Sequence, residues 1–297
     1  MSKNKKLIIS VISIVLVVAI GVTAGVLLYK DWPDVIQDFE PKSEGELRVM
    51  SFNIRCTNVG RDTWEDRIGI VTATMVNSQA DSIGVQEATP EWMATLKETL
   101  TSYDYVGVGR DDGDNQGEYS AVFYLKDKYN LIDSGNFWLS ETPDEPSLGW
   151  DAACTRICTW AVLENKETKE QYVHVNSHFD HEGIKAREES VKMILEHIEE
   201  YKDLPVVFTA DMNVKEGSDN YIEFTKVLHD TKYQAEDTMD YLTYHDTKPS
   251  KHQGDIIDYV MVNDNFNALS YKVVTAGVDD RYVSDHFPVY ADLEIKK

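Results

Sequence analysis

Carboxylate, amide and imidazole side chains stand at the ends of short apolar runs, where a strand leaves the edge of a sheet. These residues are Asn53, Glu87, Glu118, His178, Asp180, Asp211, Asn213, Asp258, Asp285 and His286. Carboxylate and carbonyl oxygens are the ligands of a hard cation such as Mg²⁺, and Asn53, Glu87, Asp211, Asn213 and Asp285 supply them. The two histidines add proton transfer or hydrogen-bond donation. Because no nucleophilic serine or cysteine motif accompanies them, the set predicts metal-assisted attack by water.

The apolar runs that carry these residues are predicted to be strands. They are LRVMSFNI at 47–54, SIGVQEA at 82–88, YSAVFYL at 119–125, RICTWAVL at 156–163, YVHVNSHF at 172–179, PVVFTADMN at 205–213 and DIIDYVMV at 255–262. Capping residues and 3.6-residue spacing predict helices over 63–79, 90–101 and 184–201. Strands mixed with helices indicate a layered α/β domain.

Seven of these segments also resemble the motifs of a known superfamily. SFNIR at 51–55, VQEAT at 85–89, GEYSAVFY at 117–124, VNSHFDH at 175–181, TADMN at 209–213, IDYVMV at 257–262 and SDHFPV at 284–289 resemble, in order, those of the endonuclease/exonuclease/phosphatase superfamily. The resemblance covers about 47–297 and implies the deoxyribonuclease I-like fold, a four-layer α/β sandwich of two packed mixed β-sheets flanked by helices. GRDDG at 109–113 and FWLSETP at 137–143 further resemble a bacterial branch.

The resemblance implies a metal site and its ligands. Glu87 resembles the main metal carboxylate, and Asn53 and Asp285 match residues close to the same ion. The expected ion is Mg²⁺, with Mn²⁺ as the alternative.

The resemblance also implies catalytic roles. Asp211 matches the acid that orients or deprotonates the attacking water, and Asn213 matches the amide that contacts phosphate. His286 matches a terminal histidine that binds a phosphate oxygen or transfers a proton, and Asp258 matches the carboxylate that orients it.

A second histidine and two supporting residues complete the implied site. His178 matches that histidine, with Glu118 as its expected partner. We expect a carboxylate beside each imidazole to set its tautomer and raise its pKa. Arg156 either contacts phosphate or is an ordinary surface residue of a strand.

Composition limits the possible partners. Among 297 residues, 29 are basic and 52 acidic, for a formal net charge of −23, and four of the lysines lie in residues 1–30. This charge argues against a protein that coats nucleic acid, although a bound cation could still hold a phosphate. Cys56, Cys154 and Cys158 have neither the number nor the spacing of a disulfide or zinc framework, so they are predicted to be buried thiols in strands.

The N-terminus predicts membrane attachment. Residues 7–29 carry no charge and, at about 1.5 Å per residue, would span roughly 35 Å as a helix. Lysines in the tail 1–6 place that tail in the cytoplasm and the rest outside the cell. The alternative is cleavage after Val22-Thr23-Ala24, which would release a secreted protein. Residues 30–46 are predicted to be a linker before the catalytic domain 47–297.

Together these features predict an exported, membrane-anchored, Mg²⁺-dependent phosphoesterase. The negative charge disfavours long polyanions, and tethering favours lipid headgroups or small phosphoesters as substrates. An extracellular Mg²⁺-dependent nuclease is the alternative, and a catalytically inactive surface binding module is a further one. No protein partner is evident from the sequence.

Overall fold

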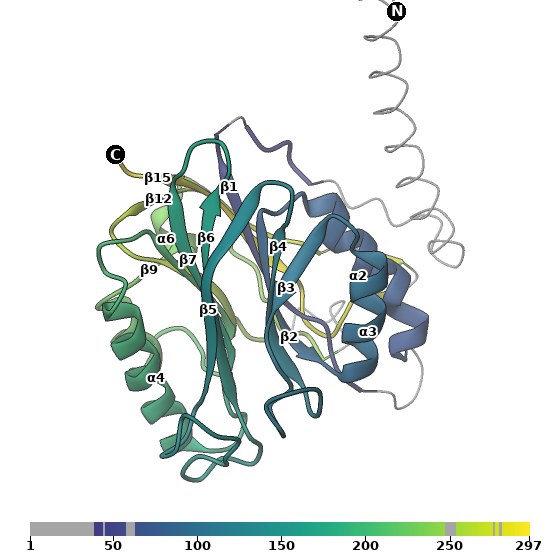
Figure 1. The fold of residues 1–297 in the computed structure, drawn as a ribbon, viewed down its shortest axis with the longest axis vertical. Helices are drawn as coiled ribbons and strands as arrows, with labels where there is room; N and C mark the ends of the chain where they lie inside the picture. The colour runs from purple at the N-terminus through teal and green to yellow at the C-terminus, as the bar shows by residue number, and fades with distance from the viewer. Residues whose placement is uncertain (1–38, 44, 58–62, 247–253, 276, 279–280) are drawn as a thin grey trace, which may run out of the picture.

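Two β-sheets packed face to face, with helices on both outer faces, form the domain in this computed structural model (Figure 1). The structure describes residues 39–43, 45–57, 63–246, 254–275, 277–278 and 281–297. The first sheet has the strand order β10-β12-β15-β1-β2-β4-β3, and the second has the order β5-β6-β7-β8-β11-β9. Each sheet contains both parallel and antiparallel pairs. The predicted pair of packed mixed sheets flanked by helices is therefore confirmed.

The strands are β1 (Leu47–Asn53), β2 (Ser82–Ala88), β3 (Tyr103–Val106), β4 (Tyr119–Leu125), β5 (Tyr129–Trp138), β6 (Ile157–Asn165), β7 (Gln171–His178), β8 (Val206–Asp211), β9 (His229–Asp230), β10 (Asp237–Thr238), β11 (Asp258–Val262), β12 (Phe266–Val273), β13 (Gly277–Val278), β14 (Arg281–Tyr282) and β15 (Val289–Ile295). The helices are α2 (Trp64–Ser78), α3 (Pro90–Thr99), α4 (Ile184–Glu199), α5 (Asp219–Thr225) and α6 (Thr231–Gln234). Strands β13 and β14 form a separate two-stranded ribbon.

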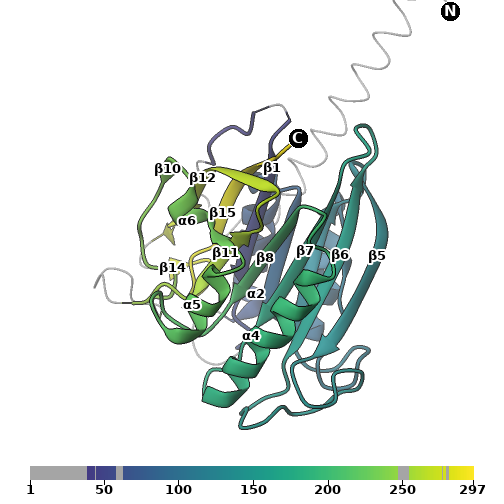
Figure 2. The same cartoon turned by 90° about the vertical axis from the view of Figure 1, so that its left-hand side faces the viewer.

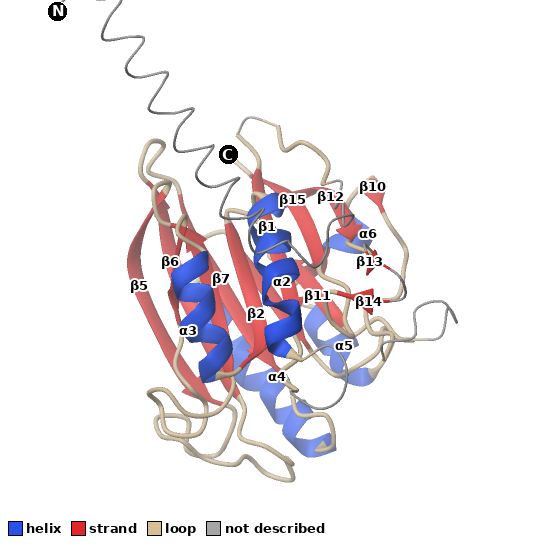
Figure 3. Ribbon diagram, turned by 90° about the vertical axis from the view of Figure 1, so that its right-hand side faces the viewer, coloured by secondary structure: helices blue, strands red, loops and turns tan. Residues whose placement is uncertain are grey.

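Three apolar layers hold the sandwich together. Helices α2 and α3 cover the outer face of the first sheet (Figure 3). Phe52 of β1 and Trp92 of α3 are buried in the layer between this sheet and the helices. Helices α4 and α5 lie over the second sheet (Figure 2), with Ile194 and Phe224 buried beneath them. The layer between the sheets contains Val49 among its buried residues. Side chains alternate along β1 between two covered faces, so the whole strand is buried.

Each strand and helix predicted from the sequence is present, with ends that differ by a few residues. Thr63 and Asp66 form the predicted capping box of α2, and Thr89 caps α3. The prediction missed strands β3, β5, β12 and β15, the two-residue strands β9, β10, β13 and β14, and helices α5 and α6. Strand β5 is an edge strand with mostly half-buried or exposed side chains, so it lacks the apolar run that marks a buried strand.

Two predictions about individual segments need correction. Cys158 is buried in β6, whereas Cys56 and Cys154 are half-buried thiols in loops. The described end of the predicted linker packs on the domain, because the Phe39 ring lies 5.7 Å from that of Tyr290. Lys42 Nζ also donates a hydrogen bond to Asp81 Oδ2, and Arg48 Nη2 donates one to the Glu40 carbonyl. The domain therefore begins before residue 47.

The predicted membrane anchor, residues 7–29, lies outside the described residues. Within the part of the chain that the structure describes, no helix has both the length and the apolar character needed to cross a bilayer.

A buried polar network joins the two sheets across the apolar layer. Gln86 Nε2 and Thr209 Oγ1 both donate to Asn176 Oδ1, at 2.7 and 2.9 Å. The His174 ring lies between Ser82 Oγ and Thr209 Oγ1, 2.8 Å from each. A Cβ atom at Gly84 would lie 2.0 Å from Thr209 Oγ1, so only glycine permits this close approach.

Burial of His174 makes stability depend on pH. Burial lowers the pKa of its imidazole to about 3, so below about pH 6.5 the unfolded chain binds a proton that the folded protein does not. Stability must then fall as pH decreases. In urea unfolding, the loss between pH 7 and pH 5 should be about 2 kcal/mol smaller for His174→Gln than for the wild type. An equal loss in both proteins would contradict this assignment.

Candidate active site

The predicted site residues meet at one edge of the sandwich. Asn53 ends β1, His178 ends β7 and Asp211 ends β8. Asp258 begins β11 directly opposite Asp211 in the sheet, while His178 is the partner of Asp211 on its other side. Glu87 of β2 joins them from the first sheet. Side chains from both sheets therefore converge on one site.

Glu87 reaches the site through an irregularity in β2. The register with β4 shifts between Val85 and Ala88, and Glu87 has a φ angle of +62°, in the left-handed region. Asn53 Nδ2 donates to Glu87 Oε1 at 3.0 Å, and Cys56 N donates to Oε2 at 2.8 Å. Burial opposes ionisation, but these bonds and the charge of His286 bring the pKa of Glu87 below its usual value. The carboxylate is therefore ionised, as a metal ligand must be.

Asp211, Asp258 and His286 form a chain of close contacts. His286 Nδ1 lies 2.8 Å from Asp258 Oδ2, and Nε2 lies 3.7 Å from Asp211 Oδ2. Burial disfavours the imidazolium, but the two carboxylates outweigh it and raise the pKa of His286 to about 10. Burial raises the pKa of Asp211 to about 7, against the opposing charge of His286. At neutral pH, His286 is cationic and Asp211 can exchange a proton. Asp258 has the predicted role of orienting His286.

His178 has a different environment from the one predicted. Its Nε2 lies 3.3 Å from Asp211 Oδ2 and 3.1 Å from Asn213 Nδ2. The expected partner, Glu118, instead accepts a hydrogen bond from Arg110 Nη1 at 2.7 Å. Burial and the nearby arginines lower the pKa of His178 well below its usual value. The predicted Glu118 contact and raised pKa are therefore wrong, because Glu118 pairs with a permanently charged guanidinium.

Asn213 is positioned to set the tautomer of His178. The backbone at Asn213 has a φ angle of +49°, and its N–H donates to Asp211 Oδ1 at 3.0 Å. Its Nδ2 donates to the Phe179 carbonyl at 3.0 Å, which sets the orientation of the amide. The same amide nitrogen lies 3.1 Å from His178 Nε2, which accepts from it when the imidazole proton is on Nδ1.

The donor set fits a divalent cation. Burial and the charge of Glu87 raise the pKa of Asp285, against the opposing charges of His286 and of Arg55, whose Nε lies 3.8 Å from Asp285 Oδ2. Glu87, His178 and Asp211 offer one group of potential ligand atoms. Asn53 uses Nδ2 to orient Glu87 and Asp211, and its Oδ1 accepts from Arg55 N. The ligand roles of Asn53, Glu87 and Asp285 stay predictions.

Arg156 is not the exposed strand residue that one interpretation described. It lies just before β6, and only 5% of its side chain is exposed. Its Nε is 3.5 Å from Asp180 Oδ2, and Nη2 is 3.1 Å from His181 Nδ1. It also contributes to the lowered pKa of His178. Arg156 therefore lies beside the site, within the protein.

Two further residues hold the site, and Arg67 is the one that had no predicted role. Arg67 of α2 is fully buried and donates to the carbonyls of Ile54 and Val283, at 2.7 and 2.9 Å, so it ties the loop after β1 to the loop that carries His286. The Tyr244 ring packs 4.9 Å from that of His286. An arginine on an amphipathic helix is ordinarily a surface residue, so the sequence offers no signal for Arg67.

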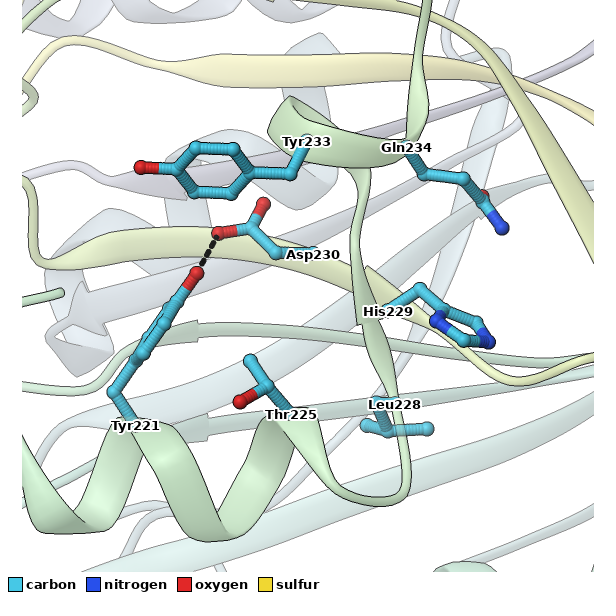
Figure 4. A pocket seen from close by; sticks show the side chains of 7 residues that line it. All are labelled: Tyr221, Thr225, Leu228, His229, Asp230, Tyr233 and Gln234. Atoms are coloured by element: carbon cyan, nitrogen blue, oxygen red, sulfur yellow. Dashed lines mark hydrogen bonds between the residues drawn. The ribbon is translucent and has the colours of Figure 1, made fainter. Parts of the chain in front are cut away.

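A pocket of about 350 Å³ lies between α5 and α6, and none of the predicted site residues lines it (Figure 4). Its buried acid, Asp230, accepts a hydrogen bond from Tyr221 at 2.9 Å and one from the backbone of Lys232 at 2.9 Å. These bonds satisfy both carboxylate oxygens, and the second caps α6. Asp230 therefore has a structural role.

The fold and this constellation define the class of the protein: it is a metal-dependent phosphoric ester hydrolase. The sequence profile of the Endonuclease/Exonuclease/phosphatase family matches residues 50–286, so the chain belongs to that family. This finding confirms the resemblance carried by the seven motifs.

Solved structures of bacterial proteins are similar over nearly their whole length. An endonuclease/exonuclease/phosphatase from Bacteroides vulgatus is 37% identical, with a TM-score of 0.81, over 84% of this chain and 99% of that one. The mannosyl-6-phosphatase of Bacteroides thetaiotaomicron VPI-5482 is 37% identical, with a TM-score of 0.79, over 83% of this chain and 99% of that one. Protein L388 of Acanthamoeba polyphaga mimivirus is 25% identical over 242 residues, which is 78% of this chain and 84% of that protein.

The contacts of Asp211 and His286 predict a large effect of truncation. Asp211→Ala and His286→Ala should each lower kcat by at least about a hundredfold, because each removes a positioned acid–base group. The measurement is the steady-state rate of phosphoester hydrolysis, with circular dichroism to verify folding. His229→Ala, which alters an exposed histidine paired with Asp264, is the control. Turnover near the wild-type rate in either site variant would rule out the assigned roles.

Proposed function

We propose that the protein is an exported phosphoesterase that uses Mg²⁺, or alternatively Mn²⁺, to hydrolyse small phosphoesters or lipid headgroups by attack of water. One observation carries the proposal: Asp211 Oδ2 lies 3.3 Å from His178 Nε2, which is neutral, and 3.7 Å from His286 Nε2, which is cationic. Their pKa values are shifted in opposite directions, downward for His178 and upward for His286. A buried acid between a neutral and a cationic imidazole supports acid–base chemistry at neutral pH.

Each residue has a distinct task in this mechanism. Asp211 accepts a proton from the attacking water, since its pKa of about 7 suits a general base. His286, held by Asp258, donates from Nε2 to a phosphate oxygen and stabilises its developing charge. The Asn213 amide holds His178 in one tautomer. A bound divalent cation, held by Glu87 and Asp285 with Asn53 beside them, would supply charge neutralisation at the phosphate.

Charge and similarity both support a small substrate. The net charge of −23 repels long polyanions, which disfavours the nuclease alternative. The relative from Bacteroides thetaiotaomicron is named a mannosyl-6-phosphatase, which supports a small phosphorylated molecule for this chain also. An anchor at residues 7–29 would hold the site near lipid headgroups outside the cell.

A substrate panel tests the activity. The full chain in detergent should release phosphate or a headgroup from sugar phosphates, sphingomyelin or phosphoinositides with Mg²⁺ or Mn²⁺ present. EDTA and Asp211→Ala should each abolish that release, because they remove the cation and the base. Cleavage of plasmid DNA or RNA alone would favour the nuclease. Metal binding without turnover of any substrate would favour the inactive binding module.

Fractionation tests the membrane anchor. In a bacterial host, the full chain should remain with the membranes after carbonate extraction, and protease added to spheroplasts should digest the domain, because residues 7–29 would cross the bilayer. A chain lacking residues 1–29 should be soluble. Recovery from the medium of a product shortened by cleavage near Ala24 would instead show secretion.

A further inference from the structure

Arg110, Glu118, Arg156 and His178 lie beside the carboxylates of the site, and we call this group the arginine corner. Each arginine also faces a carboxylate outside the group: Arg110 Nε is 4.0 Å from Asp111 Oδ1, and Arg156 Nε is 3.5 Å from Asp180 Oδ2. Arg110 pairs with Glu118 at 2.7 Å. Burial raises the pKa of Glu118, and the charges of Arg110 and Arg156 oppose this effect, so both guanidinium groups lie near it. The same two arginines lower the pKa of His178, after the larger effect of burial. The charges of Arg110 and Arg156 therefore both act on Glu118 and on His178.

Cys56 is near both this corner and the predicted metal carboxylate. Burial raises the pKa of the Cys56 thiol, and the charges of Glu87 and Glu118 raise it further. Cys56 N also donates to Glu87 Oε2 at 2.8 Å. The arginine corner thus adjoins the place where a phosphate would meet the metal centre.

Three nitrogen atoms of the corner are buried without a hydrogen-bond partner among the described residues. They are Arg110 Nε, Arg156 Nη1 and His178 Nδ1. In the tautomer of neutral His178 whose Nε2 accepts from the Asn213 amide, the proton is on Nδ1 and all three nitrogens are donors. Buried donors are nearly always paired in folded proteins, so unpaired donors on three side chains of the corner are consistent with a ligand that offers several acceptors.

The loop that carries Arg110 is built to hold it. Arg110 N donates to the Glu118 carbonyl at 3.2 Å, and the Arg110 carbonyl accepts from Trp138 Nε1 at 2.7 Å. A Cβ at Gly109 would lie 2.2 Å from the Gln116 carbonyl oxygen, so the tight turn requires glycine there. The GRDDG segment, which had no assigned role, therefore positions one guanidinium before any ligand binds.

We propose that Arg110 and Arg156 form an anion subsite that selects the terminal phosphate of a monoester over a diester, and that Arg110 is the specificity-determining residue. The proposal rests on the phosphoesterase function proposed above. A monoester phosphate carries about −1.5 to −2 charges at pH 7 and three free oxygens, whereas a diester carries one charge and has two. Permanently charged guanidinium groups gain more from the dianion, and its extra oxygen offers a further acceptor for their unpaired donors.

The test compares two esters with the same leaving group, p-nitrophenyl phosphate and bis(p-nitrophenyl) phosphate. The full-length wild type with Mg²⁺ should prefer the monoester. Arg110→Gln should lower kcat/KM for the monoester by about tenfold or more, mainly by raising KM, as expected for loss of a charged hydrogen bond. The diester value should change by less than about threefold, and the inhibition constant of inorganic phosphate should rise with the monoester KM.

Two further variants separate the subsite from secondary effects. Arg110→Gln with Glu118→Gln removes both partners, so no buried carboxylate is left unpaired, and it should show the same selective loss. Lys192→Gln on α4 removes an equal charge from an exposed position and should change neither ester. Calorimetry should show unchanged Mg²⁺ binding in Arg110→Gln.

The outcomes distinguish this proposal from the proposed function. An equal loss on both esters, or a wild type that prefers the diester, would overturn the subsite and leave the phosphoesterase standing. If the wild type hydrolyses neither ester nor any substrate of the panel, the proposed function fails. Calorimetry with inorganic phosphate then decides the subsite: weaker binding by Arg110→Gln supports it, and equal binding overturns it.

Discussion

The catalytic edge depends on the polar contact that joins the two sheets. Gln86 of one sheet and Thr209 of the other donate to the same oxygen of Asn176. Side chains alternate along a strand, so His178, two residues after Asn176, and Asp211, two residues after Thr209, return to the same side. The irregularity in β2, with Glu87 in a left-handed conformation, turns that carboxylate toward them. One buried network therefore sets the distance across which the site is assembled.

Opposite electrostatic surroundings give two identical imidazoles different tasks. His286 lies between the carboxylates of Asp258 and Asp211, which stabilise its charged form despite burial. Burial disfavours the charged form of His178, and the nearby guanidinium groups repel it further, so His178 stays neutral. Asp211 is the common neighbour of both. Paired buried charges seldom stabilise a fold by themselves. The packing of the rest of the domain therefore has to supply the stability that keeps these groups in place.

Much of the fold could be predicted because its signals are local. Apolar runs marked the buried strands, and the Thr63–Asp66 capping box marked the start of α2. Edge strand β5 and residues 39–46 were missed or misjudged because their stability comes from tertiary contacts, such as that of Phe39 with Tyr290. Motif resemblance correctly paired Asp258 with His286 but not Glu118 with His178, since a side chain near several partners is held by the strongest of them.

The sequence by itself determined which carboxylates and histidines end strands, because hydrophobic periodicity and turn residues are written along the chain. The sequence also determined the family, because the motifs and their order can be read directly along the chain. Only the tertiary structure decided the charge states of His178 and His286, the pairing of Arg110 and the anchoring role of Arg67. These properties depend on burial and on Coulomb interactions between groups far apart in the chain, and they exist only after the sheets have packed.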